Sequence, residues 1–256
     1  MKSFIAFFKK EILECVRSGK IMILGVLFLL FGIMNPAIAK LTPWLFELMS
    51  NSLADSGMIV TDVTVDALTS WTQFFKNIPM MLIVFVLVYS GIFTKEYESG
   101  TLILVLTKGL SRYKVVLAKS VVMFSLWTTG YWLCFAVTSG YNAYFWDNSI
   151  AIGLIPAAIH WWLFGIWAVC LMVFFSVLCK NYHGVLLGTG GSVLGAYIIS
   201  LFPKCSEYTP TALINSASLL TGTESADVYT KAIVITVVMC LACLAFSVSF
   251  MNKKQL

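Results

Sequence analysis

Six long stretches of this 256-residue sequence contain no Asp, Glu, Lys or Arg, and this exclusion of charge limits what the chain can fold into. A helix of about 20 residues crosses a hydrocarbon core of about 30 Å, and a charge at its centre costs roughly 2.5–3.5 kcal/mol. The charge-free stretches are residues 21–39, 77–94, 120–146, 148–179, 181–203 and 232–252. A soluble protein has no reason to exclude charge in this way. The sequence therefore predicts an all-α polytopic membrane protein with six transmembrane helices.

We expect one transmembrane domain over residues 1–256, without a soluble domain or a strong internal repeat. The fourth stretch is too long for one crossing and contains Pro156, so residues 149–155 are expected to form a separate interfacial piece. The predicted spans are residues 21–39, 77–94, 120–142, 157–179, 183–203 and 231–252.

The Lys and Arg residues predict the orientation of the chain. With both termini on one side, that side carries thirteen of the 17 basic residues, and the other side carries eight of the twelve acidic ones. Short loops rich in Lys and Arg stay in the cytoplasm, so both termini are predicted to be cytoplasmic. The net charge of +5 then reflects topology and an anionic inner leaflet, and nucleic acid is not needed as a partner. The thirteen are Lys2, Lys9, Lys10, Arg17, Lys20, Lys95, Lys108, Arg112, Lys114, Lys119, Lys180, Lys253 and Lys254.

The N-terminal segment, residues 1–20, reads as an amphipathic helix lying in the membrane surface. No small-residue cleavage site follows it, so we do not expect a removable signal peptide. The alternative is a first span that begins early. The apolar arc comprises Phe4, Ile5, Phe8, Ile12, Cys15 and Val16, and the opposite polar arc comprises Lys10, Glu11, Glu14 and Arg17.

Two outer segments are expected to be structured. Residues 40–76 carry apolar residues throughout and are expected to form short helices on the outer face. Residues 203–229 contain the apolar run Thr211–Leu220, which is too short to span. This run predicts a re-entrant or surface helical element between spans five and six.

Little chemistry is available inside the predicted spans. Apart from Lys231 at the start of the sixth, they contain no Asp, Glu, Lys or Arg, and His160 is more typical of packing than of proton transfer. Cys240 and Cys243 form a C-x-x-C pattern, but on an apolar helix without His or acid nearby they indicate packing and no metal site. We expect neither catalytic residues nor disulfides. No G-x-x-x-x-G-K-[ST] phosphate loop is present, so the chain is not expected to hydrolyse ATP itself.

Span five carries small residues every four positions. Such rows let helices approach closely in a membrane. They favour a subunit interface and intramolecular packing about equally. The row comprises Gly184, Gly188, Ser192, Ala196 and Ser200.

The cytoplasmic segment 95–119 combines charge with an apolar run that is too short to cross a bilayer. Gly100 offers a break, Thr101 a capping hydroxyl for a helix over 102–107, and Gly109 a stop. The apolar residues of this helix need a cover, which a docked protein could provide.

This segment resembles the first cytoplasmic loop of type-2 ABC exporter permeases, the separate membrane subunits of ATP-binding-cassette transporters. The family often has proline where this chain has Gly109. An amphipathic elbow helix, six spans, cytoplasmic termini and an outer re-entrant element also resemble that family, so the likeness covers nearly the whole chain. The matching residues are Glu96, Glu98, Gly100, Thr101, Leu102, Ser111, Arg112 and Lys119.

The resemblance implies a passive permease driven by a separate ATPase subunit, which carries ATP and Mg and docks around Glu96–Lys114. Glu96 and Glu98 would then orient the loop or pair with basic residues on the ATPase; the alternative is an ordinary solvated helix end. The permease would pair with a second copy or a homologous permease, with span five (Gly184, Gly188, Ser192 and Ala196) lining the seam. Its place would be the bacterial inner membrane.

The expected cargo is an amphipathic or hydrophobic peptide, such as an antimicrobial or toxin peptide, because the predicted pathway wall is apolar and aromatic. Export of lipid, polysaccharide or a small hydrophobic drug remains an alternative. An ATP-independent channel or carrier is disfavoured by the lack of intramembrane charge. A membrane enzyme is disfavoured by the lack of a catalytic constellation.

Overall fold

The computed structural model describes residues 2–54, 65–107 and 109–254, and all regular elements among them are helical. Six helical stretches of this part, built on α2, α3, α6, α7, α8 and α10, are long and apolar enough to cross a membrane. The prediction of an all-helical chain with six potential spans is confirmed. In order, the elements are α1 (Lys2–Arg17), α2 (Lys20–Ala54), α3 (Ala67–Tyr89), α4 (Thr94–Glu98), α5 (Thr101–Thr107), α6 (Arg112–Phe145), η1 (Asn148–Ile150), α7 (Leu154–Leu178), α8 (Tyr182–Ser200), α9 (Pro203–Ser206), η2 (Pro210–Thr221), η3 (Ala226–Tyr229) and α10 (Thr230–Lys253), where η marks a 3-10 helix.

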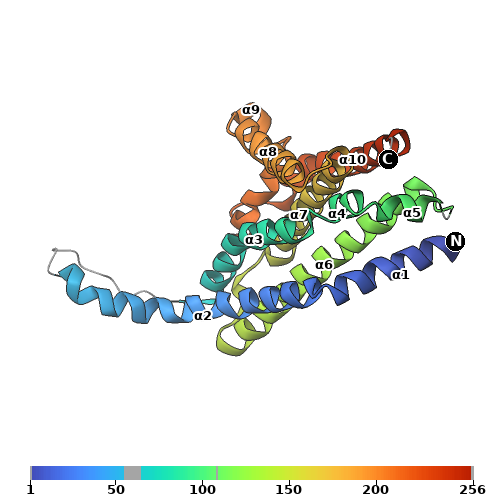
Figure 1. Cartoon of the computed structure of the whole chain (residues 1–256). Helices are drawn as coiled ribbons and strands as arrows, with labels where there is room; N and C mark the ends of the chain where they lie inside the picture. The colour runs from blue at the N-terminus through green and yellow to red at the C-terminus, as the bar shows by residue number, and fades with distance from the viewer. Residues whose placement is uncertain (1, 55–64, 108, 255–256) are drawn as a thin grey trace.

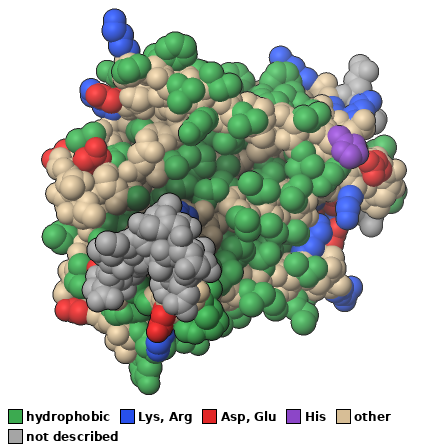
Figure 2. Space-filling view, turned by 90° about the vertical axis from the view of Figure 1, so that its left-hand side faces the viewer, with side chains coloured by type: hydrophobic (Ala, Val, Ile, Leu, Met, Phe, Trp, Pro, Cys, Tyr) green, Lys and Arg blue, Asp and Glu red, His purple; other side chains and the backbone are tan. Residues whose placement is uncertain are grey.

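Both chain ends and the short helices α4 and α5 lie toward the same end of the helix bundle, while α2 extends past the other helices at the opposite end (Figure 1). Hydrophobic side chains cover most of the face in Figure 2, and Lys, Arg, Asp and Glu lie mainly near its margins. We refer to the two ends as the cytoplasmic end, which holds α4 and α5, and the outer end, following the predicted orientation.

Large aromatic side chains fill the centre of the bundle, and glycines make room for them. Trp127 of α6 is fully buried. Its ring lies against Gly165 of α7, where a Cβ atom would overlap it, and Phe28 of α2 lies against Gly130 of α6 in the same way. Because interiors are close-packed, these glycines set the spacing of α2, α6 and α7.

The helices extend beyond several of the predicted spans, most clearly in the outer segment 40–76. Instead of separate short helices, α2 continues to Ala54 and α3 already begins at Ala67. The α2 helix continues past Lys40, whose ammonium lies 3.7 Å from the centroid of the Phe145 ring at the end of α6. The α3 helix begins early because Asp66 accepts a hydrogen bond from the Thr69 amide at 2.9 Å, an N-cap contact. Residues 55–64 of this segment lie outside the described residues.

The α6 helix likewise begins before the predicted third span. The α6 helix starts at Arg112, so the last eight residues of the predicted loop 95–119 are helical and Lys119 lies inside the helix. Pro156 lies in the first turn of α7, where a missing amide hydrogen costs nothing, and η1 precedes it. The ends of α8 and α10 differ from the ends of the predicted fifth and sixth spans by at most three residues.

The outer segment between α8 and α10 contains η2 at the predicted position of a helical element. Leu213, Leu219 and Leu220 of η2 are buried. The Ser216 hydroxyl donates to the Ala157 carbonyl of α7 at 3.4 Å, and η2 contacts α7, α8 and α10. It therefore covers the outer ends of these helices, and its re-entrant character stays a prediction.

The small-residue row of α8 packs, in part, within the chain itself. A Cβ atom at Gly188 would overlap the Phe175 ring of α7, and one at Gly184 would lie 3.0 Å from Cys179 Sγ. The Ala196 carbonyl accepts a hydrogen bond from Thr211 of η2 at 3.4 Å. Gly191 lies outside this row, and a Cβ atom built there would meet no atom within 4 Å. Packing within the chain thus accounts for Gly184 and Gly188, and a role of the row in pairing stays a prediction.

We predict that Gly188→Leu destabilises the chain by about 1–3 kcal/mol, the usual cost of overpacking, because its side chain displaces the Phe175 ring. Gly191→Leu is the matched control, since it faces open space on the same helix. Reversible unfolding in mixed detergent micelles measures both. Equal stability of the two variants would contradict the packing of Gly188 against α7.

Candidate functional site

The cytoplasmic segment consists of two short helices joined by glycine turns. The first, α4, follows a turn after α3, and Gly100 then adopts a φ of 66° before α5 begins. Gly109 adopts a φ of 86° two residues before Ser111, the residue that precedes α6. Left-handed φ values favour glycine, so the two glycines end the helices that precede them. A short helix thus occupies the position predicted at 102–107, and its role in coupling stays a prediction.

A buried ion cluster attaches this segment to α1 and α6. At its centre is Lys119 of α6, which is 1% exposed. Its Nζ lies 2.7 Å from Glu11 Oε2 of α1 and 3.1 Å from Glu96 Oε2 of α4, and it donates to the Ile92 carbonyl at 3.2 Å. The ammonium group thus donates hydrogen bonds to Glu11 and to the Ile92 carbonyl, and forms an ion pair with Glu96.

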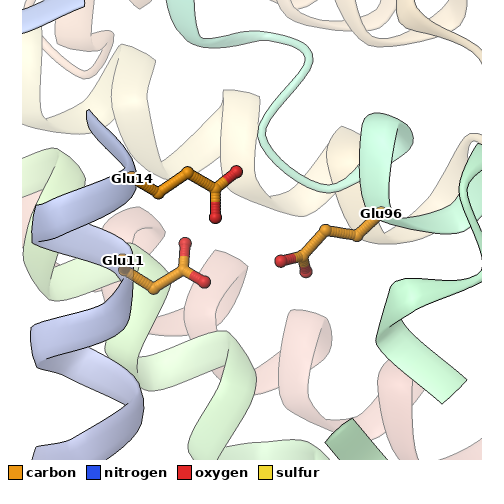
Figure 3. Close-up of side chains that lie close together, drawn as sticks. All are labelled: Glu11, Glu14 and Glu96. Carbon is orange, nitrogen blue, oxygen red and sulfur yellow. The ribbon is translucent and has the colours of Figure 1, made fainter. Parts of the chain in front are cut away.

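Lys10 of α1 completes the cluster from the more exposed side. Its Nζ lies 2.7 Å from Glu96 Oε1, 3.0 Å from Glu11 Oε1 and 2.8 Å from Glu14 Oε2. Figure 3 shows the carboxylates of Glu11 and Glu14 extending from α1 toward that of Glu96 on α4. Three carboxylates this close could hold a metal ion, but here two ammonium groups lie among them. The arrangement is that of an ion-pair network that joins three helices.

The charges of the cluster shift the pKa values of its half-exposed members. Burial alone would lower the pKa of Lys10, but hydrogen bonds to Glu14 and Glu96 and the charge of Glu11 outweigh it and raise this pKa. Burial would likewise raise the pKa of Glu14, but the hydrogen bond and charge of Lys10 outweigh it and lower this pKa. Both groups are therefore charged at neutral pH.

Sequence reasoning did not identify the face that α1 packs against the protein. Glu11, assigned to the polar arc, is 2% exposed, and it shares the buried face with Phe7 and Cys15. In the predicted apolar arc Cys15 is buried, whereas Ile5 and Val16 are 61% and 55% exposed, so only part of this arc faces the bundle. The membrane-surface position of α1 stays a prediction. A usable signal was Lys119 itself, because a Lys at the edge of an apolar stretch needs a carboxylate partner.

Phe4 and Phe8 of the predicted elbow helix are half-buried and stack on each other, with ring centroids 6.5 Å apart. Ile12 and Arg17 are exposed. Of the predicted coupling residues, Glu96 and Lys119 meet in the cluster and Leu102 is buried as an anchor. Glu98 and Thr101 are exposed, and Ser111 precedes α6 without a side-chain cap bond.

The other side of the segment is attached to the C-terminal end of α10. Arg112 Nη1 donates to the carbonyls of Met251 at 3.2 Å and Asn252 at 3.1 Å, and also contacts the Lys254 carbonyl. The Tyr97 hydroxyl of α4 donates to Met251 Sδ at 3.5 Å. Lys254 Nζ lies 4.1 Å from the centroid of the Tyr97 ring. These C-terminal partners were not predicted from the sequence.

The outward face of the segment is apolar. Ile103 and Leu104 of α5 are 46% and 62% exposed, although Leu102 beside them is buried. Between α5 and the start of α6 lies a cleft of about 380 Å³ that reaches from Ile103 to Arg112. A short helix with exposed leucine and isoleucine, anchored by the buried Leu102 and joined to the attached helix α4, has the features of a docking surface.

A second hollow lies between α3 and α8. This apolar groove of about 350 Å³ is lined by Leu82 and Val86 of α3 and by Thr189, Gly190 and Val193 of α8, among others. The Thr189 hydroxyl is buried and has no hydrogen-bond partner among the described residues. The groove therefore offers apolar walls and one polar group.

Comparison of the sequence with protein-family models and with curated proteins finds no match. The comparisons identify no family. The functional reading of this chain therefore depends on its own residues.

We predict that Lys119→Met lowers the free energy of unfolding by roughly 3–5 kcal/mol, because Glu11 and Glu96 lose the cation between them. Unfolding in mixed micelles measures this. Lys95→Met, an exposed residue of α4, is the control. Adding Glu11→Gln to Lys119→Met should recover part of the loss. If Lys119→Met is as stable as Lys95→Met, the cluster does not hold the helices together.

The attachment of α1 should also depend on pH. Because the pKa of Glu14 is lowered, its contribution to the attachment is complete above its ordinary pKa and is lost as pH falls below that ordinary value and through the lowered pKa. The raised pKa of Lys10 places the loss of its contribution at strongly alkaline pH. The mobility of a probe at the exposed Leu13 reports the attachment. In the Glu14→Gln variant, the mobility of this probe should change less as the pH is lowered than it does in the wild-type chain. An equal change of mobility in both proteins would contradict the role of Glu14.

Proposed function

We propose that this chain is the membrane-spanning permease subunit of an ATP-driven exporter, moved by a separate ATPase subunit. The observation that carries the proposal is the segment α4–α5, which presents exposed apolar residues at the cytoplasmic end while it is attached to three other helices. The chain contains no phosphate-loop motif of its own, so the ATPase would be a separate polypeptide.

The attachment of the segment suits mechanical coupling. A docking helix can move the spans only if force on it is not lost in a loose loop. Here α4 is joined to α1 and α6 through Glu96, and to α10 through Tyr97. In this proposal Glu96 orients the segment, and Glu98, which is exposed, is free to meet a basic residue of the ATPase.

The outward side chains of α5 suit a protein partner. Covering apolar surface stabilises a complex by about 25 cal/mol per Å². Ile103 and Leu104 offer this surface at the centre, with Thr101 and Glu98 at its edge. An apolar centre with a polar rim is the usual composition of a protein–protein interface.

The cargo in this proposal is an amphipathic or hydrophobic peptide exported from a bacterial cell, with lipid or a small hydrophobic drug as alternatives. The groove between α3 and α8 supports this class, because its lining is almost entirely apolar. A second copy of the chain or a homologous permease would close the pathway. The termini would lie in the cytoplasm.

The test is retention of a nucleotide-hydrolysing partner. Purified from its native membranes in mild detergent, the chain should carry an ATPase subunit, and Leu104→Glu should reduce the retained ATPase activity at least about tenfold by charging the centre of the surface. Val228→Glu, at a 52% exposed position near the outer end, is the control and should retain the partner.

Two outcomes would contradict the proposal. If the wild-type chain retains no ATPase, or moves cargo alone, it acts as an independent channel or carrier. If Leu104→Glu retains the ATPase fully, the partner docks elsewhere.

A further inference from the structure

The C-terminal helix α10 makes polar contacts at both of its ends. The two sets of contacts involve elements at opposite ends of the bundle. At its cytoplasmic end these are Arg112 of α6 and Tyr97 of α4. At its outer end they come from η2 and the turn after it. The helix thus connects the docking segment to the outer covering element.

At the cytoplasmic end, Arg112 acts as a C-terminal cap for α10. The last carbonyls of a helix have no partner within the helix and carry partial negative charge. The guanidinium of Arg112 supplies both a positive charge and hydrogen bonds to the carbonyls of Met251, Asn252 and Lys254. A charge-assisted contact of this kind is roughly twice as strong as a neutral one.

At the outer end, Tyr229 immediately precedes α10. Its hydroxyl lies within hydrogen-bond distance of Glu224 Oε2, of Ser218 Oγ at 3.0 Å and of the Asn215 carbonyl at 3.2 Å. Its ring packs on His160 of α7 with centroids 5.0 Å apart. A movement of the start of α10 therefore acts directly on η2.

Between these ends, α10 lacks the residues at which helices most often kink. Among the six long apolar helices that the structure describes, it alone contains neither Gly nor Pro, the residues at which helices bend or weaken. Its 24 residues correspond to about 36 Å. Its buried face consists mainly of small residues, and the hydroxyls of Thr236 and Ser247 on that face donate to carbonyls of α10 itself.

We propose that α10 acts as a transmission rod, with Arg112 as the positioning residue that couples the cytoplasmic segment to η2. Displacement of α4 and the start of α6 shifts the end of α10 through Arg112 and Tyr97. The far end then displaces η2, which covers the outer ends of α7 and α8. The use of this link in transport rests on the proposed function, whereas the link itself belongs to the chain alone.

Hydrogen exchange of the full chain in lipid nanodiscs tests the link without any ATPase. Arg112→Met should speed exchange about tenfold at residues 250–253, since the cap is lost. It should also speed exchange about threefold over residues 215–229. Coupling between sites is reciprocal, so Tyr229→Phe should loosen residues 250–253 in turn. Arg112→Lys should restore part of the wild-type protection at both ends.

Two matched controls separate transmission from general loosening. Lys114→Met removes a cation from the same turn of α6, and Lys231→Met removes the exposed ion pair with Glu207 beside the outer element. Neither should change exchange at the opposite end of α10. The proposal is overturned if Arg112→Met leaves residues 250–253 protected, or loosens them while residues 215–229 keep wild-type exchange. Such a failure would leave ATPase retention unaffected, so it differs from a failure of the proposed function.

Discussion

The ammonium group of Lys119 is the constraint on which the cytoplasmic end of this protein depends. A charge buried between helices next to an apolar span is costly unless it is fully paired. Glu11 and the Ile92 carbonyl accept hydrogen bonds from it, and Glu96 forms an ion pair with it, so that its partners come from three different parts of the chain. An amphipathic N-terminal helix and a short loop helix that would each be weakly held alone are thereby fixed to α6. A buried ion network of this kind specifies one arrangement, even where an apolar replacement could be equally stable.

This attachment gives the apolar residues of α5 a defined position. Ile103 and Leu104 face outward from a segment bounded by two left-handed glycines. Arg112 and Tyr97 extend the same rigid unit to the end of α10. The proposed docking surface, the ion cluster and the C-terminal cap are thus parts of one connected structure. Force applied to α5 can pass through α4 to α1, α6 and α10.

The sequence predicted the features that depend on composition alone. Exclusion of charge identified six spans, and Gly100 and Gly109 located the short helix between them. It did not find the partners that are distant in the chain. The predicted first span ends before Lys40, whereas α2 continues to Ala54, and the Lys40 ammonium contacts the Phe145 ring. Glu11 was placed on the polar arc of the N-terminal helix, but it pairs with Lys119, 108 positions away. The small-residue row of α8 was ambiguous because spacing does not reveal which surface a glycine meets, and the structure shows that Gly188 meets Phe175 of the same chain.

The most direct test of the central claim is movement of a fluorescent amphipathic peptide into vesicles that contain the purified chain, with and without its co-purified ATPase and ATP. The account predicts that accumulation requires the chain, the ATPase and ATP together, and that Leu104→Glu abolishes it. Accumulation at full rate by the chain alone would contradict the account.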